Sequence, residues 1–203
     1  MSLYIKSDTE TGAVPVFQKI WDDIRGGVAF QDANIPSDIK EIGMGTLIAT
    51  TDTDGLYDFV KTAKSNSTQT AATSIKLVPG GHLFVVGEFI MKETGATAAT
   101  ITVLTHTSAS TDTIVTSVAL GALATATKVV QAAASALGAT TIDELNDPVG
   151  VLRNTIEVRE CDLTTLYNVT AGVVTRASVI EGNLPNYVTA SQKTALTSRV
   201  QFV

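Results

Sequence analysis

Few side chains in this chain of 203 residues could do chemistry, and the two histidines are the first candidates. His82 and His106 lie far apart in the sequence, and neither has a carboxylate nearby at the spacing of a metal site. His82 follows two glycines at the start of an expected strand, where a histidine usually makes hydrogen bonds to the backbone. We therefore expect a structural role for both.

Cys161 is the only cysteine, so an internal disulfide and a two-cysteine metal motif are both excluded. Its neighbours Glu160 and Asp162 are carboxylates, and their negative charge opposes formation of a reactive thiolate. We expect an inert thiol.

The acidic residues form no catalytic set either. Residues 52–55 (Asp-Thr-Asp-Gly) resemble the opening of a calcium loop, but the downstream glutamate is missing and a strand-like run follows. A hairpin turn explains them. Asp22-Asp23 and Asp143-Glu144 are adjacent pairs whose side chains point in different directions. We expect no enzyme, no cofactor and no bound metal.

The composition excludes several classes of protein. Only 17% of residues are charged and 44% are hydrophobic, which excludes a disordered chain and a coiled coil. The net charge of -6 argues against a nucleic-acid partner. The 31 Thr, 24 Ala and 22 Val make up more than a third of the chain. Since β-branched side chains suit a pleated surface, this favours strands.

No apolar run approaches the roughly 20 residues that a membrane-spanning helix needs, so no membrane partner is expected. The N-terminus has no apolar stretch of the kind found in signal peptides. These features predict synthesis in a cytoplasm.

Residues 1–43 precede the strand-like pattern of the rest of the chain and are predicted to form an N-terminal arm. Within it, a short amphipathic helix is predicted over 14–24, ended by Gly26-Gly27, because apolar residues fall at near-helical spacing. Such a helix either docks on a neighbouring subunit or packs on its own domain.

Residues 44–203 are predicted to form a β-rich body, either a single unit or two subdomains that divide near 138–148. An Asp-Gly turn joins the expected strands 45–50 and 56–61 as a hairpin. The apolar run 83–91 is predicted as one long strand with a bulge at Gly87, and Thr189 as the cap of a helix through Leu196. The predicted fold class is mainly β, an antiparallel sandwich or barrel-like body with a short N-terminal helix or arm and a short C-terminal helix. Further strands are expected at 74–78, 100–104, 113–118, 128–131, 150–152, 155–159, 172–180 and 200–203.

Several of these segments resemble a known family. They are residues 59–63, 75–90 (Ile-Lys-Leu-Val-Pro-Gly-Gly-His-Leu-Phe-Val-Val-Gly-Glu-Phe-Ile), 101–103, 111–115, 177–185 and 199–203. Together they look like head decoration or head fibre proteins of tailed bacteriophages, with the nearest likeness to crAss-like and related phages or prophages of Bacteroidetes.

This resemblance implies a non-enzymatic virion protein on the capsid exterior, made in the cytoplasm of a bacterial host. Such a subunit binds the major capsid protein, stabilises the outer capsid lattice and commonly assembles with itself as a homotrimer. Residues 1–40 and 121–137 match nothing in the family, so decoration protein, head fibre and another virion role stay open.

The expected contact residues are apolar side chains near the two ends, because Trp and Phe often anchor interfaces. They are Phe17, Ile20, Trp21, Ile24, Phe202 and Val203. The alternative is that these side chains belong to the protein's own core.

A rival reading is a β-sandwich on the particle surface that recognises host glycans. Sugar sites usually contain Trp or Tyr, and the only Trp lies in the expected arm, which argues against this role. An enzyme such as a depolymerase is a third class, disfavoured because no catalytic set emerges.

Overall fold

The structure is a computed structural model that describes most of the chain. The described residues are 15–30, 35–36, 39, 41–51, 55–70, 73–79, 81–93, 95, 97–108, 110–133, 145, 147–157 and 169–203.

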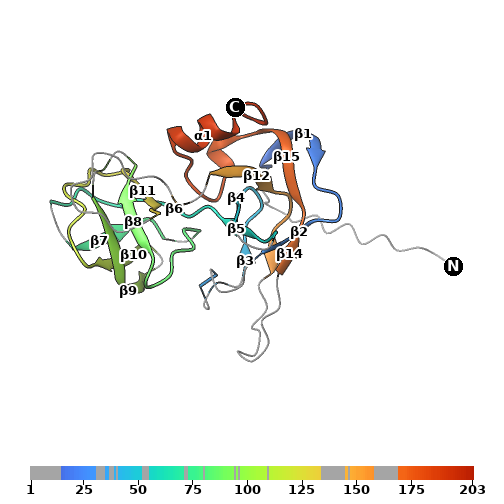
Figure 1. The fold of residues 1–203 in the computed structure, drawn as a ribbon. Helices are drawn as coiled ribbons and strands as arrows, with labels where there is room; N and C mark the ends of the chain where they lie inside the picture. Colours follow the sequence, from blue (N-terminus) through green and yellow to red (C-terminus); the bar gives the residue numbers. More distant parts are fainter. Residues whose placement is uncertain are drawn as a thin grey trace, which may run out of the picture.

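The chain forms two β lobes that lie side by side (Figure 1). The terminal lobe contains both ends of the described chain, and its eight-stranded sheet curls into a half-barrel. The inserted lobe contains a six-stranded sheet built entirely from residues 62–131. The chain therefore leaves the terminal lobe after the strand Tyr57–Phe59, completes the inserted lobe, and returns with the strand Pro148–Leu152.

The terminal lobe has the sheet order β1-β15-β12-β4-β5-β2-β14, and β16 also pairs with β15. Its elements are β1 (Phe17–Asp23), β2 (Val28–Phe30), β4 (Leu47–Thr50), β5 (Tyr57–Phe59), β12 (Pro148–Leu152), β14 (Val169–Ala171), β15 (Val173–Val179), the 3-10 helix η2 (Glu181–Asn183), α1 (Ala190–Leu196) and β16 (Val200–Phe202). A small separate ladder joins β3 (Glu41–Ile42) to β13 (Ile156–Glu157).

The inserted lobe has the sheet order β6-β11-β8-β9-β10-β7, and all its pairings are antiparallel. Its strands are β6 (Thr62–Lys64), β7 (Ser74–Leu77), β8 (Phe89–Lys92), β9 (Ala98–Ser108), β10 (Thr111–Thr116) and β11 (Lys128–Gln131).

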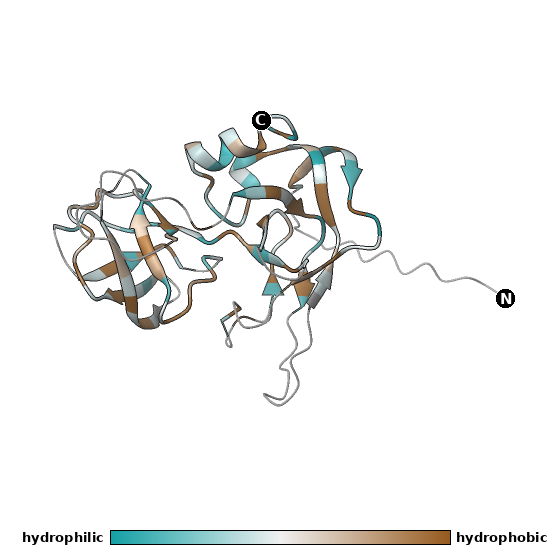
Figure 2. Ribbon diagram, in the orientation of Figure 1, coloured by the Kyte–Doolittle hydropathy of each residue, from teal (hydrophilic) through white to brown (hydrophobic). Residues whose placement is uncertain are grey.

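Buried and more exposed residues alternate along the strands, and the buried ones form the cores. In β10 every second residue is buried, so Asp112, Ile114 and Thr116 face inward while the intervening side chains are partly exposed. Hydrophobic and hydrophilic residues accordingly interchange along the ribbons of both lobes (Figure 2). Each lobe has its own apolar cluster, around Phe84 and Ile114 in the inserted lobe and around the stacked Phe30 and Phe59 in the terminal lobe.

The predicted fold class is confirmed: the protein is mainly β with a short C-terminal helix. The hairpin prediction is also confirmed, since β4 and β5 pair antiparallel, with Thr50 opposite Tyr57. Asp52, Thr53 and Asp54 of its turn lie outside the described residues, as do most of 138–148, so the subdomain boundary there stays a prediction.

The predicted N-terminal helix is wrong: β1 occupies residues 17–23 and pairs antiparallel with β15. The near-helical spacing misled because a short isolated helix is marginally stable, whereas the edge of β15 offers backbone hydrogen bonds. β1 and β2, which belong to the predicted arm 1–43, therefore lie in the same sheet as β4 and β5, which belong to the predicted body 44–203.

The long strand predicted over 83–91 is also wrong. Only Phe89–Lys92 forms strand β8, and the preceding residues form an irregular loop. Leu83 and Gly87 have left-handed φ angles of 57° and 99°, which interrupt an extended backbone. The loop is apolar because Leu83 and Phe84 are buried, and a hydrophobic run alone does not distinguish a strand from a buried loop.

A buried ion pair marks the point where the chain enters the inserted lobe. Lys61, between β5 and β6, donates from Nζ to Glu88 Oε1, and its side chain is only 1% exposed. Glu88 also accepts a hydrogen bond of 2.9 Å from the Val85 amide through Oε2. The pair thus fixes the irregular loop to the lobe junction.

We predict that Lys61→Met lowers the free energy of unfolding by about 3 kcal/mol, because it leaves the Glu88 carboxylate without its cation in a mostly buried site. The double variant Lys61→Met/Glu88→Leu should recover much of that loss, since no charge remains buried. Urea unfolding measures both. Lys193→Met is the matched control, because its pair with Glu181 is 37% and 41% exposed and should contribute under about 1 kcal/mol. A double variant as unstable as Lys61→Met alone would contradict this account.

Candidate functional site

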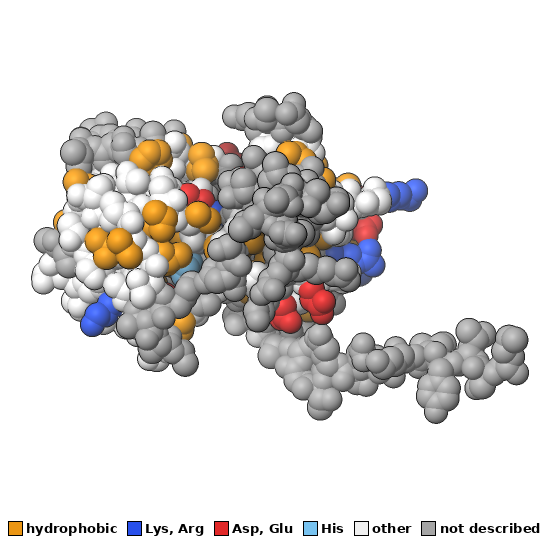
Figure 3. Space-filling view, turned by 90° about the horizontal axis from the view of Figure 1, so that it is seen from below, with side chains coloured by type: hydrophobic (Ala, Val, Ile, Leu, Met, Phe, Trp, Pro, Cys, Tyr) orange, Lys and Arg blue, Asp and Glu red, His pale blue; other side chains and the backbone are white. Residues whose placement is uncertain are grey.

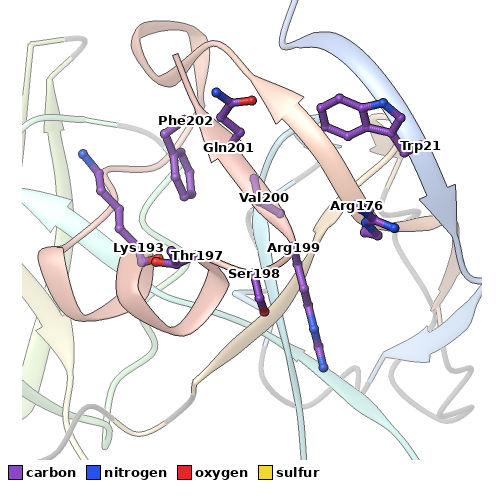
Figure 4. A pocket seen from close by; sticks show the side chains of 9 residues that line it. All are labelled: Trp21, Arg176, Lys193, Thr197, Ser198, Arg199, Val200, Gln201 and Phe202. Carbon is purple, nitrogen blue, oxygen red and sulfur yellow. The ribbon is translucent and has the colours of Figure 1, made fainter.

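A pocket of about 490 Å³ lies beside the C-terminal strand of the terminal lobe (Figure 4). Trp21 of β1 and Phe202 of β16 stand on opposite sides of it, and Gln201 and Val200 lie between them. The remaining lining residues are Arg176 of β15, Lys193 of α1, and Thr197, Ser198 and Arg199 of the turn that joins α1 to β16.

Strand β15 positions the walls of this pocket. Its pairing with β1 is antiparallel and its pairing with β16 is parallel, so Ala177 is matched to both Ile20 and Val200. The turn from α1 is closed by a hydrogen bond of 2.8 Å from the Arg199 amide to the Leu196 carbonyl oxygen. Leu196 itself is fully buried in the apolar cluster beneath, which holds α1 against the sheet.

Trp21 reaches the pocket because of a β-bulge. Ile20 and Asp22 pair with the consecutive residues Ala177 and Arg176, so Trp21 is an extra residue on β1. A bulge of this kind bends the strand and redirects the side chain of the extra residue. Trp21 is 49% exposed and shares the pocket with Arg176.

The pocket carries an excess of positive charge in a chain whose net charge is -6. Three lining residues are cationic, and only Lys193 forms an ion pair among the described residues, at 2.6 Å from Glu181. Arg199 donates a hydrogen bond of 3.4 Å to the Val149 carbonyl oxygen, and the Arg176 guanidinium has no ion pair within the described part of the chain. A fourth cation, Lys19, lies 5.5 Å from the centre of the Trp21 ring.

The six residues predicted as contacts divide into two groups. Phe17, Ile24 and Phe202 are partly buried and pack against the apolar clusters of the terminal lobe. Ile20, Trp21 and Val203 are large exposed hydrophobic residues, 39%, 49% and 53% exposed. The exposed group comes from both ends of the described chain, which pair with opposite sides of β15.

His82 has the structural surroundings that its sequence context predicts. Its Nδ1 accepts a hydrogen bond of 3.2 Å from the Phe84 amide, which leaves Nε2 to donate to Asp112 Oδ2 at 3.2 Å. Both side chains are at most 3% exposed. This buried pair joins the irregular loop to β10 and is not open to a substrate.

The other candidates give no second site. His106 lies in β9, where its backbone pairs with Asp112. Cys161 and the pair Asp143-Glu144 lie outside the described residues, while Asp22 and Asp23 lie near the end of β1. Within the described ranges, no three His, Cys, Asp or Glu side chains gather in a group that could hold a metal ion.

The sequence did not indicate the pocket. Arg176, Lys193 and Arg199 come from a strand, a helix and a turn, and they form no motif in the sequence. The sequence does predict the capped helix and the apolar terminal strand, which contribute walls of the pocket, but it does not indicate that cations gather there.

Comparisons of the chain with models of protein families, with curated proteins and with solved structures found no match. No helix in the described part of the chain is long and apolar enough to cross a membrane. Any account of function therefore depends on the surface chemistry itself. An open pocket with cationic and aromatic walls is suited to binding an anionic group that also has an apolar part.

The pocket depends on the cap of α1. Thr189 Oγ1 accepts a hydrogen bond of 3.1 Å from the Gln192 amide, and Gln192 Oε1 accepts one of 3.0 Å from the Thr189 amide. We predict that Thr189→Ala lowers the free energy of unfolding by about 1–2 kcal/mol, because it leaves a buried amide without its partner. Thermal unfolding followed by circular dichroism measures the loss.

The control for this prediction is Thr194→Ala on the exposed side of the same helix. Thr194 only donates to the Ala190 carbonyl oxygen four residues earlier, so its loss should change stability by less than about 0.5 kcal/mol. Equal effects of the two substitutions would show that the cap does not hold the helix.

Proposed function

We propose that this chain is a virion structural protein, an auxiliary capsid subunit of the head decoration or head fibre kind. It binds the major capsid protein on the outer lattice, associates with itself, and acts by binding rather than by catalysis. Binding of this kind stabilises an assembled shell by mass action, because the subunit has affinity for the lattice and not for its dispersed components.

The observation that carries the proposal is the edge of the terminal lobe at β1. In the described part of the sheet, β1 pairs with β15 alone, so its other side is an open edge. Ile20 and Trp21 are exposed on this strand, and Val203 is exposed next to β16. An open strand with exposed apolar side chains favours pairing with another chain.

The inserted lobe supports the proposal in a second way. In the view of Figure 3 it presents mainly hydrophobic and uncharged polar side chains, with few charges. Val86 and Val103 are 54% and 47% exposed on this lobe. A surface with so little charge suits contact with neighbouring copies of the subunit, since less charge must be desolvated, while the edge at β1 supplies the contact with the capsid.

We expect the wild-type protein to co-sediment with expanded capsids of the virus that encodes it. The double variant Ile20→Ala/Trp21→Ala should bind at least about tenfold more weakly, because it removes the two large apolar side chains of the open edge. Co-sedimentation over a range of protein concentrations measures the affinities.

The matched control is Val86→Ala/Val103→Ala, which removes exposed apolar side chains from the inserted lobe instead. It should bind within about twofold of the wild-type protein. If the control loses binding and the β1 variant keeps it, the contact face lies on the inserted lobe. No binding of the wild-type protein at any salt concentration would refute the proposed function.

A second candidate is a surface module that recognises host glycans, and one observation favours it. Trp21 stands at the rim of a pocket that also contains hydroxyl, amide and cationic groups from Thr197, Gln201 and Arg176. This role predicts saturable retention on host polysaccharide that free sugar abolishes. Retention unaffected by Trp21→Ala would exclude the pocket as a sugar site.

A further inference from the structure

We propose that the pocket between Trp21 and Phe202 binds an acidic, extended segment of a partner protein. Carboxylates of that segment pair with Arg176 and Arg199, and its apolar side chains contact the two aromatic rings. The inference rests on the proposed capsid-binding function and specifies the chemistry of the partner.

Charge complementarity is the first argument. Arg176 and Arg199 are exposed, and neither forms an ion pair with another described residue. Lys193 adds a third positive charge, which its pair with Glu181 largely neutralises. Two guanidinium groups therefore remain available, and guanidinium is the cation best suited to carboxylates because it can donate two parallel hydrogen bonds.

The aromatic walls select against a free inorganic anion. Trp21 and Phe202 line the same cavity, and each has a lysine ammonium near its ring, at 5.5 Å for Lys19 and 5.8 Å for Lys193. Aliphatic groups of a bound chain would cover these rings while its carboxylates reach the arginines. The cavity of about 490 Å³ has room for a few side chains.

The surroundings of the pocket favour a protein segment over a sugar. Ile20 and Val203, the sequence neighbours of Trp21 and Phe202, are aliphatic and exposed, and neither can make a hydrogen bond to a sugar through its side chain. Trp21 also belongs to the open edge of β1, where an extended chain can form backbone hydrogen bonds. The pocket and the edge are thus one continuous surface for an extended acidic chain.

The experiment uses Trp21 as its own reporter, because it is the only tryptophan of the chain. The probe is the blocked hexapeptide (Glu-Val)3, titrated into the full-length protein at low salt, and (Lys-Val)3 is the charge-reversed control. We expect a saturable change in tryptophan fluorescence with the acidic peptide alone, weakened by added salt.

Arg176→Gln and Arg199→Gln should each weaken binding of the acidic peptide about tenfold. Lys76→Gln, which removes one exposed positive charge from β7 of the inserted lobe, should leave binding unchanged. Equal weakening by Lys76→Gln, or no binding of the acidic peptide to the wild-type protein, would overturn the inference. Binding of oligogalacturonate without binding of the peptide would also overturn it and identify an acidic sugar site instead.

Capsid co-sedimentation separates this inference from the proposed function. If the wild-type protein binds capsids and Arg176→Gln binds equally well, the pocket inference fails while the capsid-binding function stands. If the wild-type protein does not bind capsids, the proposed function fails whatever the peptide does. Because Arg176 is exposed, its substitution should leave the circular dichroism spectrum unchanged, which shows that the variant is folded.

Discussion

The terminal lobe depends on strand β15, because three strands from distant parts of the sequence pair with it. β1 covers one side along its length, while β12 and β16 divide the other side between residues 173–174 and 177–179. The central residues Val174, Ala177 and Val179 are fully buried, so the strand is also the centre of an apolar cluster. Both ends of the described chain are therefore fixed to a single scaffold, with β1 on one side of β15 and β16 on the other.

The inserted lobe is connected to the terminal lobe through the segment that precedes α1. Lys128 donates a hydrogen bond of 2.6 Å to the Val188 carbonyl oxygen, and the Ala190 amide donates one of 2.8 Å to Glu93 Oε1. Thr62 donates to the Tyr187 carbonyl oxygen, and Lys64 lies 4.9 Å from the centre of the Tyr187 ring. Residues 187, 188 and 190 thus each make a polar contact with the other lobe. Since α1 follows directly, a change in the inserted lobe would reach the pocket through this segment.

Local signals in the sequence predicted much of the fold, whereas strand β1 and the pocket were missed because both depend on contacts between distant residues. The hairpin of β4 and β5 and the Thr189 cap were predictable because a few adjacent residues encode each of them. β1 was mistaken for a helix because its strand conformation depends on pairing with β15, whose Ala177 lies 157 residues after its partner Ile20. The pocket was missed for the same reason: the bulge at Trp21 and the parallel pairing of β16 exist only in the assembled sheet.

The gathering of cations at the pocket is notable because charged residues are scarce in this chain. A chain with 14 basic and 20 acidic residues has few cations to place, yet three of them line one cavity. Folding alone does not explain this placement, because exposed cations contribute little to stability and mutual repulsion opposes their gathering. The inserted lobe, in contrast, shows few charges in the view of Figure 3, which suits the proposed contact with other subunits. Under that proposal, the orientation of a partner would come from the few places where charge is concentrated, and the arginines of the pocket are such a place.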